Sequence, residues 1–278
     1  EKGAQAFAKA LSSGDPSQMS ALCISSSNEN DVLDIKPLKI PTDVQITKIS
    51  KKGATFAYKI GGRKIASYVD FAPVKDKDGE VSYRPYASAV YAGTYVTRIH
   101  LNGKSLGGVH HEVSFMPGEY KFSYDDGVFK ASGTADMGIG SSIDFGKGNH
   151  VSNRRGSVDL HTIAKPSRNY SKVLRKALDS SGNSSCFDSE ECEALAQGRR
   201  IDTSNVTFTT SNDIDDVVFS GQARVTVAYG FFGNDYENRM VDINTLEPKI
   251  NFTAPSGSGT TKMYISYANE NSVLEQGD

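Results

Sequence analysis

The middle of the chain shows the most regular alternation of apolar and polar residues. From Thr94 onward, alternate positions are apolar until Asn102-Gly103, a dipeptide that favours a two-residue β-hairpin turn. A second alternating run breaks at Pro117-Gly118 and resumes with three aromatic residues, Tyr120, Phe122 and Tyr124. Because side chains two positions apart face the same side of a strand, this pattern predicts a small β-sandwich over residues 89–150.

Helical periodicity is found instead at the start of the chain. Residues 3–12 place apolar side chains such as Phe7 on one helical face. Asp15-Pro16 then supplies an N-cap residue and a proline at the first helical position, which predicts a second helix. Alternating runs follow, and Gly61-Gly62 between two of them predicts a hairpin. We therefore expect an α+β domain over residues 1–88.

The last part of the chain combines helical and strand patterns. A polar, glycine-rich stretch over residues 146–157 marks a boundary, and residues 166–178 then have helical periodicity. The strands that we expect after this helix cover residues 205–210, 216–219, 223–229, 249–253 and 260–267. This order predicts a second α+β domain over residues 157–278.

Two features of this organisation resemble known families. The middle of the chain resembles the Ig-like and PEGA-like modules on bacterial cell surfaces. It shares with them a pattern of three strands, of which the first two are separated by Asn-Gly and the last two by Pro-Gly-x-Tyr. Helices followed by antiparallel strands resemble NTF2-like domains, in which the helices pack on a curved sheet. The resemblance implies an α+β fold with an NTF2-like domain over residues 1–88, an Ig/PEGA-like β module over residues 89–150 and a second NTF2-like domain over residues 157–278.

As a whole, the chain resembles membrane-anchored cell-envelope proteins of Gram-positive bacteria, those of the TcaA type. The order of domains across most of the chain carries this resemblance. The chain departs from the family pattern at Phe208, where the family leads us to expect a tryptophan, and it lacks the family's Cys-Pro pair. The resemblance implies an extracytoplasmic protein at the cell surface, which binds or scaffolds a cell-wall component or another envelope protein.

Composition narrows the classes of partner. The chain has 31 Lys and Arg against 33 Asp and Glu, and no block of like charge, so we expect no nucleic-acid partner. No apolar run approaches the ~18 residues of a membrane-spanning helix. The chain starts at Glu1 without a methionine or a signal peptide, so we expect that an N-terminal anchor or leader has been removed. We also expect a monomer.

The three cysteines bear on the compartment. Cys186 and Cys192 enclose five residues, a spacing that does not fit the CxxC pairs of zinc sites but permits a small disulfide loop. A disulfide predicts an oxidising, extracytoplasmic setting, and two unpaired thiols are the alternative. Cys23 stands alone, and we interpret it as a core residue of the second helix.

Two short motifs contain residues that bind metals elsewhere. In His110-His111-Glu112 only His110 and Glu112 share a strand face, and two ligands do not make a structural zinc site. Residues 76–80 have the acidic composition of a calcium loop but lack its glutamate at the twelfth position. We interpret these motifs as a strand end and a turn, and the acidic residues near Asp179 and Asp188 as helix ends. The sequence therefore predicts no metal and no cofactor.

A basic cluster is the candidate contact for a ligand. Lys147, Arg154 and Arg155 lie in the polar stretch between the last two predicted domains. They could contact an anion of the envelope, such as teichoic acid, phospholipid or a peptidoglycan carboxylate. The alternative is a solvated linker.

The sequence contains no pattern typical of an enzyme. No serine or cysteine lies beside a histidine in a catalytic motif, and Gly138-Ile-Gly-Ser-Ser lacks the lysine of a phosphate-binding loop. We therefore predict a non-enzymatic envelope protein that binds or scaffolds other components, with no catalytic residues. One alternative is an enzyme or small-ligand-binding protein that uses an NTF2-like cone lined by Tyr68 and Asp70. Another is an adhesin or a pilin-like structural subunit.

Overall fold

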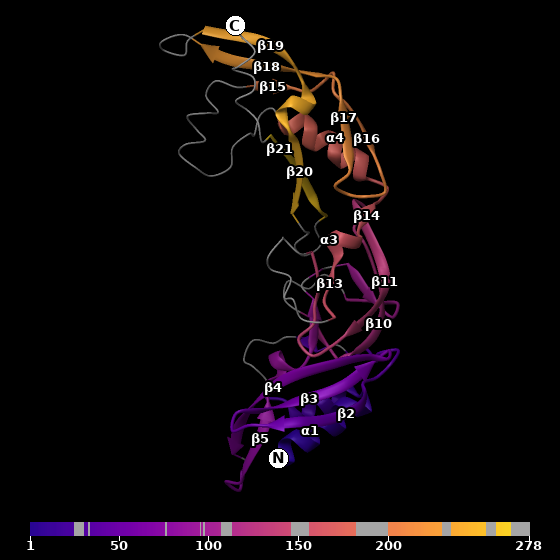
Figure 1. Ribbon diagram of the computed structural model, residues 1–278, viewed down its shortest axis with the longest axis vertical. Helices are drawn as coiled ribbons and strands as arrows, with labels where there is room; N and C mark the ends of the chain where they lie inside the picture. Colours follow the sequence, from indigo (N-terminus) through magenta and orange to yellow (C-terminus); the bar gives the residue numbers. More distant parts are fainter. Residues whose placement is uncertain are drawn as a thin grey trace. The chain divides into compact units, whose positions relative to one another are not determined.

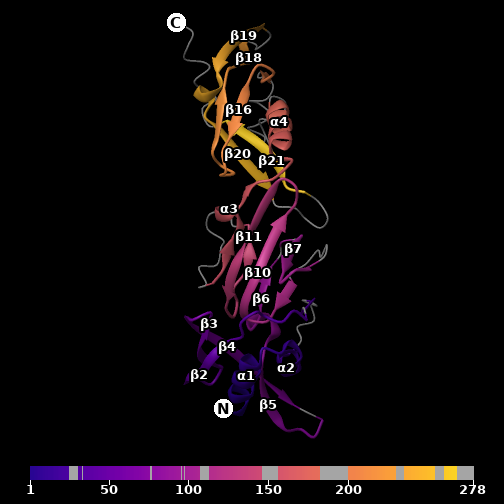
Figure 2. The same ribbon diagram turned by 90° about the vertical axis from the view of Figure 1, so that its right-hand side faces the viewer.

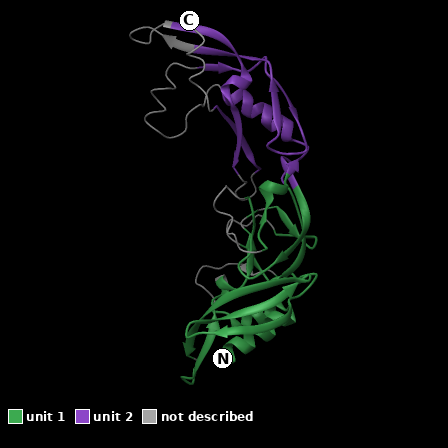
Figure 3. Ribbon diagram, viewed as in Figure 1, with its two compact units in different colours: residues 1–125, 131–164, 256–259 green, residues 126–130, 165–255, 260–278 purple. Residues whose placement is uncertain are grey.

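The chain forms two compact units (Figure 1, Figure 3). The computed structural model describes residues 1–24, 31–32, 34–75, 77–94, 96, 98–106, 113–145, 156–181, 200–229, 235–253 and 260–267. Of these, residues within 1–125 and 131–164 belong to the first unit, and those within 126–130, 165–255 and 260–278 belong to the second.

The first unit contains most of the strands. Its helices are α1 (Lys2–Ser13), α2 (Pro16–Leu22), α3 (Leu160–Ile163) and the 3-10 helix η1 (Ala87–Ala89). Its longer strands are β2 (Thr42–Ile49), β3 (Gly53–Ile60), β4 (Arg63–Lys75), β5 (Val81–Pro85), β10 (Gly118–Asp125) and β11 (Phe129–Met137), the last of which begins in the second unit. Its short strands are β1 (Asp31–Val32), β6 (Ala92–Thr94), β7 (Ile99–Leu101), β8 (Lys104–Ser105), β9 (Val113–Phe115), β12 (Ile143–Asp144) and β13 (Val158–Asp159).

The second unit contains one long helix and several hairpins. Its helices are α4 (Tyr170–Ser181) and the 3-10 helix η2 (Ile243–Leu246). Its strands are β14 (Lys165–Pro166), β15 (Arg200–Asp202), β16 (Thr207–Thr210), β17 (Val217–Ser220), β18 (Gln222–Tyr229), β19 (Asp235–Asp242), β20 (Pro248–Thr253) and β21 (Lys262–Tyr267). The sequence did not predict β19, whose residues are mostly polar.

A four-stranded antiparallel sheet, in the order β2-β3-β4-β5, forms the base of the first unit. Gly61 and Gly62 connect β3 to β4 with φ angles of 57° and 91°. Two successive positive φ angles are the requirement of the two-residue hairpin turn that matches strand twist. The predicted Gly61-Gly62 hairpin is therefore confirmed.

Helices α1 and α2 cover one face of this sheet (Figure 2). The Phe7 ring of α1 lies 4.9 Å from the Phe56 ring and 6.1 Å from the Phe71 ring, between centroids, in edge-to-face geometry. Asp15 caps α2 by accepting a hydrogen bond from the Ser17 N–H at 2.9 Å, with Pro16 at the first helical position. Both predicted helices are therefore confirmed, together with the N-cap.

The predicted Asn102-Gly103 hairpin is also confirmed. It joins β7 to β8, and its two residues have φ angles of 50° and 82°. Strand β10 pairs with β7 and turns Tyr120, Phe122 and Tyr124 inward, where all three side chains are buried. The alternation of the sequence therefore identified the inner face of this sheet correctly.

Residues 1–88 and the strands after them share one hydrophobic core. Val90, Tyr91, Met116 and Ile139 belong to the same buried cluster as the residues of α1 and the four-stranded sheet. The Ile139 N–H donates a hydrogen bond to the Tyr58 hydroxyl at 2.9 Å. The boundary that we expect at residue 88 thus lies inside the first unit, and independent folding of residues 1–88 stays a prediction.

The predicted α+β class with NTF2-like domains is wrong. Of the residues that the structure describes, 52% lie in strands and 20% in helices, and there are four α-helices among them. The strands form many small, mainly antiparallel sheets. An NTF2-like domain has instead one curved sheet on which its helices pack. Helical periodicity located α1, α2 and α4, but strand alternation carries no information on how strands are grouped into sheets.

In the second unit, α4 packs against the β20–β21 hairpin (Figure 2). Leu174 and Leu178 are fully buried on its inner face. The Tyr170 hydroxyl donates a hydrogen bond to the Ile214 carbonyl at 2.5 Å, and the Arg175 guanidinium donates to the carbonyls of Val206 and Thr203 at 2.5 and 3.0 Å. These bonds satisfy buried backbone groups and fix the helix on the loops beside it.

Asp126 is a buried acidic residue of the second unit. Its carboxylate accepts hydrogen bonds from the N–H groups of Val128, Phe129 and Thr261 at 2.9, 2.8 and 2.7 Å. Burial acts to raise the pKa of Asp126, but Thr261 and the backbone N–H donors outweigh burial and hold this pKa below its ordinary value of 3.8. The ionised carboxylate therefore ties the β10–β11 turn to the chain before β21.

We expect replacement of the Asp126 carboxylate to make stability depend on pH. Because the pKa is lower in the folded state, the charged carboxylate stabilises the fold above about pH 4 and loses this effect as pH falls through the folded pKa. Urea unfolding at several pH values should therefore show a stability difference between the wild type and Asp126→Asn that is largest near neutral pH and shrinks in acid. The exposed Asp216→Asn serves as the control. A difference that is constant with pH would contradict this role.

We expect the Tyr58 hydroxyl to stabilise the shared core of the first unit. Tyr58→Phe leaves the buried Ile139 N–H without its acceptor, which should cost about 1–3 kcal/mol of unfolding free energy. Tyr68→Phe is the control. The ring of Tyr68 is exposed and its hydroxyl lies 3.3 Å from the Ser50 hydroxyl, so loss of this hydroxyl should change the unfolding free energy by less than about 0.5 kcal/mol. Equal losses in the two variants, measured by urea unfolding, would refute the special role of Tyr58.

Candidate binding surfaces

The outer face of the four-stranded sheet is open to solvent. In β3, the side chains of Ala54, Phe56, Tyr58 and Ile60 are buried against the helices. Alternation along the strand therefore turns Thr55, Ala57 and Lys59 to the opposite face. Among the described helices of the first unit, none covers that face in Figure 2, where α1 and α2 lie on the inner side.

Strand register gathers lysines on this outer face. Lys64 of β4 lies directly opposite Lys59 of β3, and Lys48 of β2 lies opposite Thr55. The side chain of Tyr68 on β4 also points outward and is half-exposed, and the hydroxyl end of its ring lies beside the Gly53 backbone. We call the side chains of Lys48, Lys59, Lys64 and Tyr68 the basic face. Lys51 and Lys52, in the turn between β2 and β3, are exposed at one end of the sheet.

The charge of this sheet opposes that of the remaining chain. Residues 42–75 contain seven Lys and Arg against two Asp, a net charge of +5, whereas the whole chain has a net charge of −2. Lys59 Nζ lies 2.7 Å from an Asp43 carboxylate oxygen, but Lys48 and Lys64 form no ion pair with any residue that the structure describes.

A pair of like charges placed directly across two strands destabilises a sheet. The Lys59–Lys64 pair is such an arrangement, and Asp43 neutralises only one of its two charges. An anion bound on the basic face would remove this repulsion.

Sequence reasoning missed the basic face for a geometric reason. Its lysines are separated by apolar residues that point inward, so they form no run of like charge along the chain. Only the register of three strands places Lys48, Lys59 and Lys64 on one face, with Lys48 four residues, or about 13 Å, along β3 from the Lys59–Lys64 pair. The signal that could have found them is alternation of lysine with buried apolar residues in adjacent strands.

Glu119 and Asp136 form a carboxylate pair elsewhere in the first unit. Lys39 Nζ lies 2.8 Å from Glu119 Oε2, and burial together with the charge of Glu119 raises the pKa of Asp136. The backbone of Gly61 occupies the space beside both carboxylates, since a Cβ added there would lie 2.7 Å from an Asp136 oxygen and 2.9 Å from Glu119 Oε2. The tip of the β3–β4 hairpin therefore packs beside this pair.

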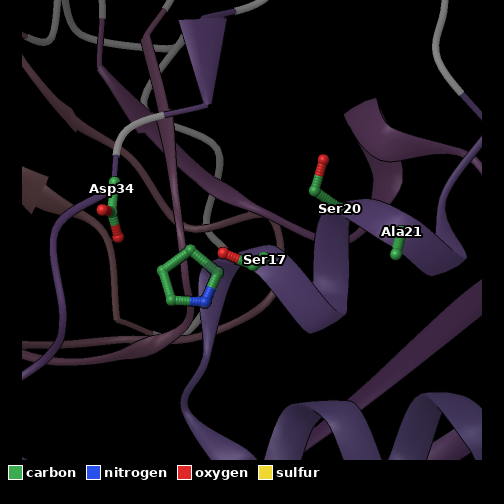
Figure 4. A pocket seen from close by; sticks show the side chains of 5 residues that line it. Ser17, Ser20, Ala21 and Asp34 are labelled. Atoms are coloured by element: carbon green, nitrogen blue, oxygen red, sulfur yellow. The ribbon is translucent and has the colours of Figure 1, made fainter.

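Two pockets lie near α2. Figure 4 shows the smaller, of about 460 Å³, with Ser17, Ser20 and Ala21 of α2 near Asp34. Its polar groups are two serine hydroxyls and one carboxylate. The larger pocket, of about 630 Å³, lies beside β5 and is lined by the start of α1, the end of α2 and residues 80–85.

Cys23 follows α2 and packs against the core, as the sequence predicts. Burial raises the pKa of the Cys23 thiol to about 11, an effect that a hydrogen bond with Tyr91 only partly offsets. Because the thiolate is the nucleophilic form of cysteine, a thiol that stays protonated at neutral pH is a poor nucleophile. The interpretation of Cys23 as a core residue, and not as a catalytic one, agrees with this environment.

Most of the residues that the sequence singled out as sites cannot be placed. Cys186 and Cys192, the basic cluster, the His110 motif, Asp76 and Asp188 lie outside the described residues, so the disulfide and the anion contact stay predictions. Tyr68 and Asp70 are both exposed on the outer face of the sheet, which is not a cone. Asp179 pairs with Arg175 at 2.6 Å.

Within the described part of the chain, no three acidic, histidine or cysteine residues are grouped as metal ligands. No described helix is both long enough and apolar enough to cross a membrane. Comparison of the chain with models of protein families, with curated proteins and with solved structures found no match.

Proposed function

We propose that this chain is a non-enzymatic binding protein of the bacterial cell envelope, and that the basic face holds an anionic, phosphate-bearing polymer of that envelope. The single observation that carries the proposal is the gathering of Lys48, Lys59 and Lys64 on one open sheet face. The envelope assignment rests on the resemblance to membrane-anchored proteins of the TcaA type. We propose an extracytoplasmic location at the cell surface and a monomeric state on the same ground.

The chemistry of the basic face fits a repeating polymer of phosphates. Lysine is a compact, rotatable point charge that binds phosphate without fixed geometry, whereas arginine favours paired contacts with one planar partner. A polymer with regularly spaced phosphates can contact several lysines at once, and it gains affinity because these contacts are linked. Tyr68 adds an exposed ring against which the backbone of the polymer can pack.

The same face fits a membrane surface less well. Helices and patches that bind lipid insert apolar side chains between the headgroups. Tyr68 is the exposed large hydrophobic side chain on the described basic face. Ile49 of β2 is exposed as well, but it lies opposite Ala54 and therefore belongs to the inner face. Attraction to a soluble polyanion needs no such insertion.

The proposal is tested with poly(glycerol phosphate) as the ligand and the full chain as the protein. Lys48→Glu combined with Lys64→Glu reverses the two charges of the basic face that have no ion pair, and we expect binding to weaken at least about tenfold. The wild-type affinity should also fall steeply with added salt, because screening acts on exposed charges. Isothermal titration or fluorescence anisotropy gives both results.

The matched control is Lys172→Glu combined with Lys176→Glu on the exposed side of α4, which changes the net charge by the same amount. Two comparison ligands are poly-glutamate, a polyanion without phosphate, and vesicles of anionic lipid, which present a membrane surface. Stronger binding to poly(glycerol phosphate) than to either is the expected result. Equal weakening by both double variants would show that net charge alone matters. Wild-type binding no stronger than to uncharged dextran would also reject the proposal.

A further inference from the structure

An acidic side chain, that of Asp43, contacts the basic face at Lys59. A carboxylate oxygen of Asp43 lies 2.7 Å from Lys59 Nζ. Both side chains are open to solvent, with exposed fractions of 59% for Asp43 and 40% for Lys59. Among the described residues, Lys59 is the one partner of the Asp43 carboxylate. The contact therefore acts on a single lysine of the basic face.

A β-bulge in β2 brings Asp43 to this position. Between Thr42 and Gln45, β2 advances three residues while its partner β3 advances two, so β2 contains one extra residue. Val44 packs against the core and fills the inward position. Asp43 is therefore the extra residue, and its carboxylate reaches Lys59 on the outer face. Bulges commonly redirect a side chain in this way.

The backbone of Asp43 adopts a left-handed conformation, with a φ angle of 52°. This conformation is unfavourable for residues with a Cβ atom, although aspartate and asparagine tolerate it better than most. Unfavourable backbone positions are concentrated at functional sites. A bulge on an edge strand such as β2 also discourages pairing with another sheet, but that purpose does not require an acidic residue in contact with Lys59.

The ion pair between Asp43 and Lys59 is weak enough to be exchanged for a ligand. An ion pair that is open to solvent stabilises a protein little, because water screens both charges. Lys64 lies directly opposite Lys59 and forms no ion pair with a described residue. An anion that contacts both amines removes the repulsion between them, whereas the Asp43 carboxylate contacts Lys59 alone. A ligand phosphate can therefore replace this carboxylate.

We propose that Asp43 is an internal competitor that determines which anions the basic face binds. In the free protein its carboxylate occupies Lys59, and a phosphate of the bound polymer displaces it and bridges Lys59 and Lys64. Displacement requires only a rotation of the exposed Asp43 side chain. An anion that reaches Lys59 alone exchanges with the carboxylate and gains little, so Asp43 disfavours such ligands. This inference rests on the proposed function of the basic face.

The test compares the full wild-type chain with Asp43→Asn, and the probe is poly(glycerol phosphate). Asparagine has nearly the size of aspartate and accepts the same backbone conformation, so this variant removes the charge alone. We expect the variant to bind the polymer about two- to fivefold more tightly, the effect of releasing an exposed ion pair. Asp43→Gly also fits a positive φ angle and should give the same gain if Asp43→Asn does not fold.

A double-mutant cycle with Lys59→Gln separates competition from general repulsion. In the Lys59→Gln chain Asp43 has no amine to occupy, so we expect Asp43→Asn to add little affinity there. The control is Asp216→Asn in the second unit, which changes the net charge by the same amount and should leave binding unchanged. Equal gains from Asp43→Asn with and without Lys59 would show that only the charge of Asp43 matters, and would overturn the inference.

Failure of this inference and failure of the proposed function give different results. If the wild type binds the polymer and Asp43→Asn binds it no more tightly, only the role of Asp43 is rejected. If both chains bind the polymer no better than uncharged dextran, the proposed function is rejected and the inference with it. Isothermal titration of the polymer into each chain provides these affinities.

Discussion

Burial of one face of the four-stranded sheet is the constraint on which the rest of the first unit depends. Phe56, Tyr58 and Val69 point into a core that α1 fills from one direction with Phe7 and Leu11. Residues far along the chain complete that core, because Ile139 donates its N–H to the Tyr58 hydroxyl and Met116 joins the same cluster. A sheet with one face covered in this way can keep its other face in water, and in this chain that other face carries Lys48, Lys59 and Lys64.

Short sequence patterns correctly predicted those turns, helix caps and strand faces that depend only on residues close together in the chain. The Gly61-Gly62 and Asn102-Gly103 turns, the Asp15 cap and the inward aromatic residues of β10 depend on neighbours within a few positions. The grouping of strands depends on pairs such as Thr55 with Tyr68, which no local pattern specifies. For this reason the elements were predicted well, whereas the NTF2-like arrangement was wrong.

Sequence reasoning missed the candidate surfaces for a related reason. Lys48, Lys59 and Lys64 are dispersed in the sequence and become a surface only when β2, β3 and β4 adopt their register. The pocket beside β5 likewise depends on three separate segments of the chain, the start of α1, the end of α2 and residues 80–85. Sequence reasoning instead favoured residues that are adjacent in the chain, such as Arg154 and Arg155, which lie outside the described residues.

Chemical footprinting of lysines tests the central claim most directly, because it reports on the native side chains of the basic face. Reductive methylation of the ε-amines, followed by mass spectrometry of peptides, is compared with and without poly(glycerol phosphate). The account predicts that the polymer slows modification of Lys48 and Lys64 and leaves Lys172 and Lys176 on α4 unchanged. Equal protection of both pairs, or protection of the α4 pair alone, would contradict the assignment of the polymer to the basic face.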